Sequence, residues 1–178
     1  MNQPFSALRY RVTQFFRALT ARRSISEEKV EQAIHILTPE AQALFRRQAV
    51  QDQRHALEVH HTLRQAGHTD PQLLAAALLH DAGKAAARLS LWQRAGIVLM
   101  SRFAPRLLAH LSRGEPRGWR RPFVVHAQHA EIGARWAGEA GCSHLTAALI
   151  RRHQGRLTSC KTEEDQLLLA LQAADSMN

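Results

Sequence analysis

The sequence predicts an all-α fold. Apolar residues recur at intervals of three and four along the chain, as in amphipathic helices, and no stretch alternates as a half-buried strand would. Start and stop signals divide this pattern: Thr38-Pro39, Asp70-Pro71 and Thr162 can begin helices, and Gly67 and Gly141 can end them. With 178 residues, 45% of them hydrophobic and 22% charged, the chain is long enough to bury a core as one domain, with or without an extension.

Residues 1–49 are expected to form a helical extension that packs on the main domain. Residues 5–23 have an apolar stripe at helical spacing and an arginine-rich polar face. Such a helix can lie on a membrane, but packing of the stripe on the parent domain is the interpretation we adopt. Ser24-Ile25-Ser26-Glu27 is typical of a capping box and would open a second helix through about Leu37.

The main domain is expected over residues 50–178. A helical pattern that begins at Thr38-Pro39 continues to Ala66, and a very apolar helix follows Asp70-Pro71. Residues 85–121 are expected to form one or two helices, divided or kinked at Pro105. Further helices are expected over 121–140, from Ser143 to about residue 153, and from a capping box at Thr162 to about residue 175.

The apolar helix delivers an adjacent histidine and aspartate, His80 and Asp81, to its own end. Neighbouring residues of a helix point about 100° apart, but in a fraying last turn both side chains can converge on one cation. An imidazole nitrogen and a carboxylate oxygen suit a borderline divalent metal such as Mn, Fe, Co, Ni or Zn. Gly83 would then let the chain turn away. The alternative is a histidine that only interacts with the helix dipole.

Four other candidate ligands occur before and after this pair along the chain. They are His55 in Asp52-Gln53-Arg54-His55, His129 in His129-Ala130-Glu131-Ile132-Gly133, His153 in Ile150-Arg151-Arg152-His153, and Asp175 in Gln172-Ala173-Ala174-Asp175. From about Gln51 to Asp175, this order resembles the HD superfamily of metal-dependent phosphohydrolases. His-Asp-Ala-Gly-Lys at 80–84 is similar to the His-Asp-x-Gly-Lys subtype of cyclic-dinucleotide phosphodiesterases and small bacterial nucleotide hydrolases. The cyclic di-GMP enzymes carry Gly-Tyr-Pro after the last aspartate, whereas this chain ends Ser176-Met177-Asn178, so that substrate is not implied.

The resemblance implies an HD-domain-like helical bundle and an enzyme that hydrolyses a phosphate ester or anhydride of a nucleotide-like substrate by metal-activated water. It implies that one ion is bound by His55, His80, Asp81 and Asp175, and that His129 and His153 hold a second, weaker ion that shares Asp81. Binuclear members often have a further histidine where this chain has Gln154, so one or two ions are expected. Catalytic roles are expected for Asp81 and Lys84.

For several side chains, the sequence allows two roles. His126 is the alternative to His129, since both would lie on one helix face, and His60, His61 and His68 are expected at the surface or in support of the ligands. Lys84 would bind a substrate phosphate or protonate the leaving oxygen, or else only favour a helix end. Arg54 and Arg88 are candidates for substrate binding, with solvated side chains as the alternative.

The net charge of +9 is unevenly distributed. Residues 1–23 carry five arginines and no acid, and residues 84–121 carry nine lysines or arginines against one acid. Basic segments indicate anionic partners, here a small phosphorylated substrate, nucleic acid or a membrane surface. Residues 84–121 would form a wall or lid over the metal site, or else a solvated helical pair. A second hypothesis for the whole protein is a non-enzymatic basic helical protein that binds nucleic acid on an HD-like scaffold.

The remaining features predict an ordinary intracellular chain. The longest apolar run, residues 73–79, is far shorter than a membrane span of roughly 20 residues. The N-terminus lacks a compact apolar region with a small-residue cleavage site, so a cytoplasmic location is expected. Two cysteines, Cys142 and Cys160, do not make a disulfide framework.

Overall fold

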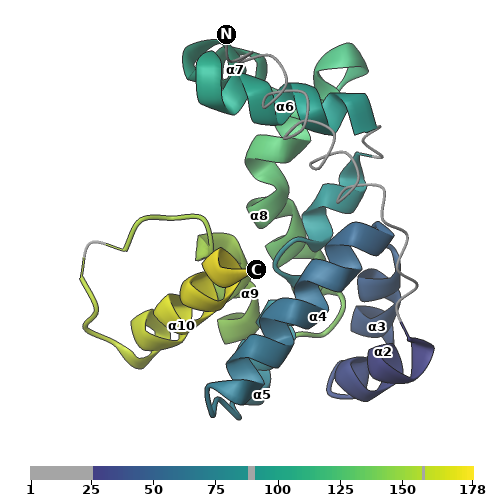
Figure 1. The fold of residues 1–178 in the computed structure, drawn as a ribbon, viewed down its shortest axis with the longest axis vertical. Helices are drawn as coiled ribbons and strands as arrows, with labels where there is room; N and C mark the ends of the chain where they lie inside the picture. The colour runs from purple at the N-terminus through teal and green to yellow at the C-terminus, as the bar shows by residue number, and fades with distance from the viewer. Residues whose placement is uncertain (1–25, 88–90, 158) are drawn as a thin grey trace, which may run out of the picture.

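The computed structural model describes residues 26–87, 91–157 and 159–178, and these fold into helices with no strand among them (Figure 1). The prediction of an all-α fold is confirmed. The helix expected over 5–23 and the substrate-binding candidate Arg88 lie outside the described residues. The helices are α2 (Glu27–Ile34), α3 (Pro39–Arg46), α4 (Val50–Gln65), α5 (Pro71–Leu79), the 3₁₀ turn η1 (Ala82–Ala86), α6 (Leu91–Phe103), α7 (Pro105–Leu111), the 3₁₀ turn η2 (Gly118–Arg120), α8 (Arg121–Glu139), α9 (His144–Arg152) and α10 (Glu163–Met177).

Helix α5 is the centre of the hydrophobic core. Every residue from Leu73 to Leu79 is buried, as expected of a helix that is apolar on all sides. It packs against α4 and α9, while α9 packs against α8 and α10 against α4. Ile34 of α2 and Phe45 of α3 belong to the same core, so the described part of the expected N-terminal extension packs directly on the main domain. The division at residue 49 stays a prediction.

The signals at Gly67, Asp70, Gly141 and Thr162 act where the sequence places them, whereas the capping box expected to open α2 does not, because its N-cap is Ser26 and the Ser26 side chain makes no capping hydrogen bond. The Asp70 side chain accepts hydrogen bonds from the backbone N–H groups of Gln72 and Leu73, at 2.9 and 2.8 Å. Thr162 and Asp165 form the expected capping box of α10. Gly67 and Gly141, which follow α4 and α8, have φ angles of 87° and 79°, the left-handed conformation that favours glycine at a helix end.

The helix expected from Thr38-Pro39 to Ala66 is in fact two helices, so that expectation was wrong. Helix α3 ends at Arg46 and α4 begins at Val50, although neither glycine nor proline marks the break. The cause is a tertiary contact: the buried Gln48 side chain donates from Nε2 to the carbonyl of Leu78 in α5 at 3.0 Å, and Gln53 donates to the Gln48 carbonyl at 2.9 Å. This contact ties the chain before α4 to the end of α5.

Helices α6 and α7 lie at one end of the molecule, at the top of Figure 1, and α7 packs on α6 and α8. Pro105 divides the two helices, as the sequence predicts. Helix α7 contributes no buried residue. Among the described residues, no helix combines the length and apolarity that crossing a membrane requires.

Candidate metal centre

Two glycines bring the end of α5 against α8. A Cβ atom added to Gly83 would lie 2.0 Å from the carbonyl oxygen of His129 and 2.7 Å from the backbone nitrogen of Gly133. Because those atoms belong to the backbone, only glycine fits at residue 83. Gly133 lies at the same contact, because a Cβ added there would lie 3.1 Å from the backbone nitrogen of Gly83. Gly83, expected to turn the chain, serves the same close approach, and its φ is not positive.

The six candidate ligands gather in two adjacent groups. In the first, His55 of α4, His80 at the end of α5 and Asp175 of α10 present donor atoms within 4.8 Å of one another. The Nε2 atom of His55 donates to Asp175 Oδ1 at 2.8 Å, and the Nε2 atom of His80 lies 3.6 Å from the same oxygen. This group is partly open to solvent, since His55 and Asp175 are only half-buried.

The second group consists of Asp81, His129 of α8 and His153, which follows α9, and all three are buried. Asp81 Oδ1 lies 3.2 Å from His129 Nε2 and 3.9 Å from His153 Nε2. The sequence-based grouping placed Asp81 with the first set of ligands and let the second ion share it. In the structure its Oδ1 atom faces the second set, while its Oδ2 atom lies 3.5 Å from His80 Nε2. Asp81 therefore stands between the two groups.

The three buried histidines are held in the same way. His80 Nδ1 donates to the carbonyl of Ala77, His129 Nδ1 to that of His126 and His153 Nδ1 to that of Ile150, at 2.9, 2.6 and 2.7 Å. Each bond joins a ring to the carbonyl three residues earlier. In a neutral imidazole with Nδ1 protonated, Nε2 is an acceptor with its lone pair exposed. The Nε2 atoms of all three rings therefore face the centre, close to Asp81.

Two of these nitrogens are buried without a hydrogen bond. The Nε2 atoms of His80 and His129 have no hydrogen-bond partner among the described residues. Beside His129, Nε2 lies 3.2 Å from a carboxylate oxygen of Asp81, and without a proton on either atom these two acceptors would repel each other in a buried place. A proton or a cation between them removes the repulsion, and unsatisfied buried polar groups are otherwise rare and costly. The two groups could therefore hold a metal ion, as the sequence predicts.

The charges at the centre also suit metal ligands. Burial of Asp81 favours its neutral form, but the neighbouring His80, then His129 and Lys84, hold its pKa well below the usual range. Burial, reinforced by His80, lowers the pKa of His153 to about 4, so this ring is neutral at pH 7 and free to bind a metal. The hydrogen bond between His55 and Asp175 raises the pKa of the histidine and lowers that of the aspartate.

The other candidates occupy different places. His126 belongs to neither group of donors, and its carbonyl instead orients His129, which favours His129 of the two alternatives. Lys84 Nζ donates to Asp81 Oδ2 at 2.5 Å, so it lies at the centre. Gln154 is exposed.

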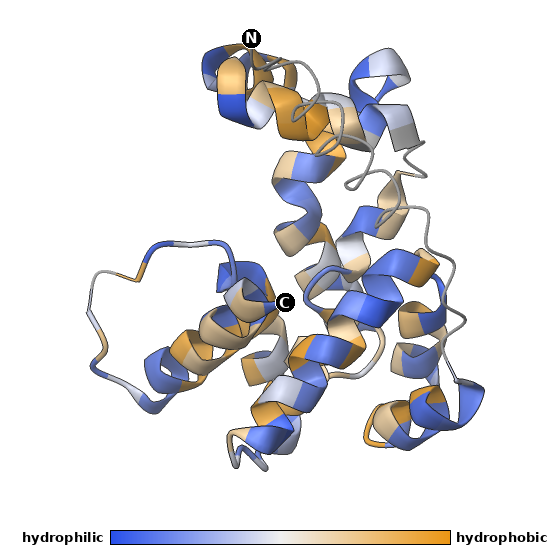
Figure 2. Cartoon of the chain, in the orientation of Figure 1, coloured by the Kyte–Doolittle hydropathy of each residue, from blue (hydrophilic) through white to orange (hydrophobic). Residues whose placement is uncertain are grey.

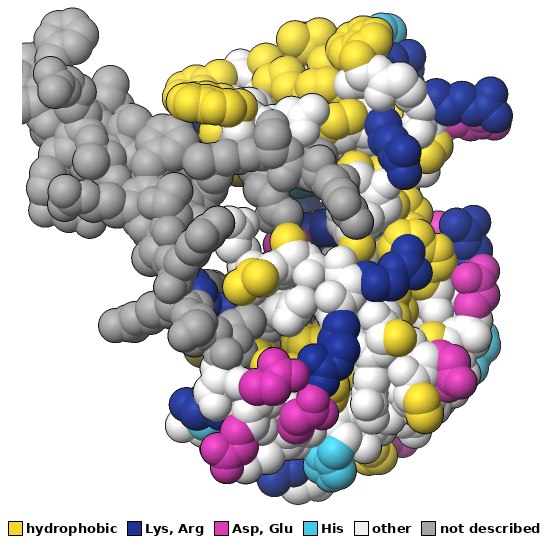
Figure 3. Space-filling view, turned by 90° about the vertical axis from the view of Figure 1, so that its right-hand side faces the viewer, with side chains coloured by type: hydrophobic (Ala, Val, Ile, Leu, Met, Phe, Trp, Pro, Cys, Tyr) yellow, Lys and Arg dark blue, Asp and Glu magenta, His cyan; other side chains and the backbone are white. Residues whose placement is uncertain are grey.

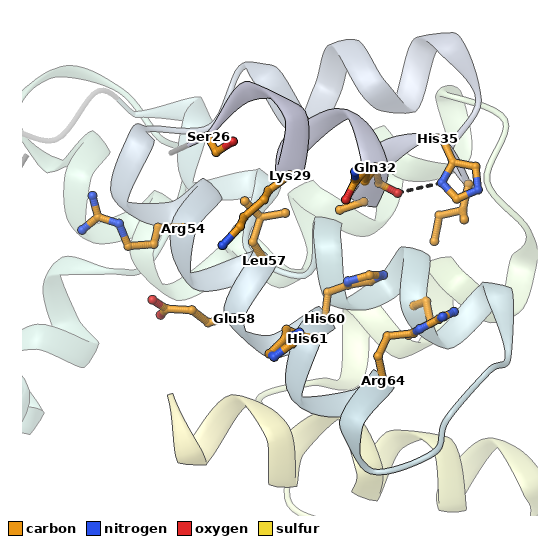
Figure 4. A pocket seen from close by; sticks show the side chains of 13 residues that line it. Ser26, Lys29, Gln32, His35, Arg54, Leu57, Glu58, His60, His61 and Arg64 are labelled. Carbon is orange, nitrogen blue, oxygen red and sulfur yellow. Dashed lines mark hydrogen bonds between the residues drawn. The ribbon is translucent and has the colours of Figure 1, made fainter. Parts of the chain in front are cut away.

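Arg54, expected to bind substrate, lines a groove of about 800 Å³ between α2 and α4 (Figure 4). Leu57, which also lines it, lies nearly opposite His55 on α4, because successive helical residues are about 100° apart. His60 and His61, expected at the surface or in support of the ligands, line the same groove. A role for Arg54 at the metal centre stays a prediction.

Gln172 is the residue whose role the sequence did not reveal. Its side-chain nitrogen donates to the carbonyls of His153 and Gly155 at 2.9 and 2.7 Å, and so ties the end of α9 to α10. It stands three residues before Asp175, on the same side of α10. That spacing was the available signal, because a polar side chain one turn from a metal ligand often supports its neighbours.

Comparison of the chain with models of protein families, with curated proteins and with solved structures finds no match.

Proposed function

We propose that this protein is a metal-dependent phosphohydrolase of the HD type, acting on a phosphate ester or anhydride of a nucleotide-like substrate. One observation carries the proposal. A buried carboxylate, Asp81, stands between two groups of imidazole and carboxylate donors, and two buried imidazole nitrogens beside it lack a hydrogen bond. A scaffold that had lost its metal would not need donors kept in this state.

The donor set favours particular metals. Four imidazoles and two carboxylates suit Mn, Fe, Co, Ni or Zn, whereas Mg and Ca prefer sites made of oxygen atoms. Each group offers three side-chain donors, which leaves positions open for water and substrate, as in catalytic rather than structural sites. One or two ions are compatible with this arrangement.

The residues then divide the work. A bound divalent ion supplies a more acidic water molecule and offsets charge on phosphoryl oxygens. Asp81 would link the two donor groups, because its Oδ2 atom faces His80 and its Oδ1 atom faces His129. Lys84 has three donor hydrogens, of which one is directed at Asp81, so the others can contact a phosphate oxygen or the leaving oxygen. Its side chain is partly exposed and can reach a substrate.

The first experiment measures metal in protein purified without added metal. Stoichiometric Mn, Fe, Co, Ni or Zn is expected by elemental analysis. Asp81→Ala should remove the metal and abolish hydrolysis while the helical circular dichroism stays near normal. His129→Ala should lower the metal content, and the matched variant His126→Ala should not. Metal retained in Asp81→Ala would refute the assignment.

The second experiment identifies the substrate class. Nucleotides, dinucleoside polyphosphates and generic phosphate esters would be screened with each metal, and release of phosphate or nucleotide measured. The proposal requires turnover of at least one nucleotide-like compound that Asp81→Ala does not support. Metal-free wild-type protein that retards RNA in a gel, without turnover, would favour the non-enzymatic alternative.

A further inference from the structure

Large hydrophobic side chains gather on the exposed side of α6, α7 and η2. Nine such side chains are exposed among the described residues, and six of them fall between residues 92 and 119. We call five of them the α6–α7 face: Val98, Leu99, Phe103, Leu107 and Trp119. Figure 2 shows the apolar character of α6 and α7, and Figure 3 shows hydrophobic side chains clustered over this end of the molecule.

The exposure of this face is unusual for a protein surface. Phe103 and Trp119 are 76% and 70% exposed, although burying an aromatic side chain is worth about 1.5 to 3 kcal/mol. Scattered apolar residues need no explanation, whereas a contiguous group of large ones indicates an interaction site. Leu99 and Phe103 are four residues apart on α6 and therefore share a side of that helix, and Leu107 follows on α7.

The rim of the α6–α7 face is positively charged. The guanidinium carbon of Arg102 lies 5.8 Å from the centre of the Phe103 ring, and Arg106 and Arg113 are exposed on and just after α7. The only acid in residues 84–121 is Glu115, and it pairs with Arg117 at 2.8 Å. The face thus combines an apolar surface with uncompensated positive charge.

Charge decides what can cover this face. A second copy of the chain would bring two arginine rims together, and these repel each other. Residues 5–23 have an apolar stripe that is expected to pack on the main domain, but on this face their arginines would lie beside the arginine rim, which favours another place for that stripe. A single-stranded nucleic acid can stack on Phe103 and Trp119, but it offers nothing to aliphatic side chains such as Leu99. An anionic lipid surface accepts all three kinds of side chain: aliphatic groups enter the acyl boundary, aromatic rings lie at headgroup level, and arginines meet the negative charge.

We propose that the α6–α7 face docks this protein on the surface of an anionic lipid bilayer. Helices α6 and α7 lie in the plane of the interface and do not cross the membrane. Their separation from the hydrophobic core, to which α7 contributes nothing, lets the apolar face enter the lipid without unfolding the domain. The metal centre, built from other helices, stays outside the bilayer.

The test is co-sedimentation of the full chain with vesicles. One set is phosphatidylcholine alone, and the other contains about 30% phosphatidylglycerol. Binding should be about tenfold stronger or more on the anionic vesicles and should weaken as salt rises. Phe103→Ser combined with Leu107→Ser should lower the partition coefficient about tenfold or more, and Arg102→Glu combined with Arg106→Glu should do the same.

Matched controls change similar residues elsewhere on the described surface. Leu169→Ser on α10 and Arg156→Glu after α9 alter exposed side chains outside the α6–α7 face and should leave binding unchanged. Metal content and circular dichroism should stay at wild-type values in every variant, which separates this proposal from the proposed enzymatic function.

Three results would overturn the proposal. The first is a wild-type protein that fails to bind anionic vesicles at low salt. The second is undiminished binding by the Phe103 and Leu107 variant, which would assign the lipid contact to the basic residues 1–23. The third is loss of self-association or of RNA binding in that variant, with lipid binding intact, which would identify a second copy or RNA as the occupant.

Discussion

Replacing Gly83 with alanine tests how the metal centre is assembled. In the present geometry the added Cβ would lie 2.0 Å from the His129 carbonyl oxygen, 2.8 Å from its carbonyl carbon and 2.7 Å from the Gly133 nitrogen. Favourable contacts between non-bonded carbon atoms occur at roughly 3.5 to 4.0 Å. The end of α5 and the middle of α8 must therefore separate by about 1 Å or more, because neither backbone segment can move aside locally.

The expected cost is at the upper end of the range for overpacked cores, about 3 kcal/mol. For a chain of this size, each kcal/mol shifts Tm by about 2 to 4 °C, so Gly83→Ala should melt about 6 to 12 °C below wild type. The same separation would lengthen the 3.2 Å approach of Asp81 to His129. Metal affinity should consequently fall as well.

The assay is thermal unfolding followed by circular dichroism, with metal content measured on the same samples. Gly138→Ala is the matched control, because Gly138 is also in α8 but a Cβ there would meet nothing within 4 Å. That variant should be as stable as wild type, or more stable by up to about 1 kcal/mol from helix propensity. If Gly83→Ala melts together with Gly138→Ala and keeps its metal, the close approach does not determine the centre.

Two further variants examine the supports of single ligands. Gln172→Ala removes the donor that holds the carbonyls of His153 and Gly155; we expect a loss of about 1 kcal/mol in denaturant unfolding and a weaker metal site at His153, and an unchanged metal affinity would make Gln172 purely structural. Asp175→Asn removes the negative partner of His55; titration with Mn should then show fewer ions per chain, while a wild-type count would mean that Asp175 is not a ligand.

The sequence predicts local structure well because local signals control it. Asp70 and Thr162 carry caps that act on the backbone two or three residues away, and Gly67 takes a conformation that its own lack of Cβ permits. The break between α3 and α4 has no such signal. It depends on Gln48 reaching the Leu78 carbonyl, thirty residues distant in the chain, and no pattern within either segment announces that contact.

The candidate site shows the same contrast between what local sequence predicts and what tertiary contacts determine. The resemblance of the motif order to the HD superfamily was enough to select six side chains that the structure brings together. Their grouping was not predictable, because it depends on which oxygen of Asp81 faces which helix. The role of Gly83 was also hidden: its proximity to His129 exists only once η1 crosses α8. The sequence identifies which residues matter, but the roles of Asp81 and Gly83 depend on how helices distant in the chain pack together.

The two donor groups should fill with metal in an order that depends on pH. An ion at the first group must displace the proton that His55 shares with Asp175, and this hydrogen bond raises the pKa of His55 above its ordinary value of about 6.5. Affinity there should therefore rise as pH increases through and beyond that value, since protons compete with the ion.

At the second group the competition is weaker, because the pKa of His153 is lowered to about 4 and the ring is already neutral. We therefore expect the buried group of Asp81, His129 and His153 to bind first at pH 6, although the sequence suggested that His129 and His153 serve the weaker ion. Equilibrium dialysis with Mn should give nearly one ion per chain at pH 6 and a higher value at pH 8. In His55→Ala the count should stay near one at both values, whereas His153→Ala should lose most of its metal at pH 6. Equal losses in the two variants at pH 6 would show that His55 and its proton do not set the order.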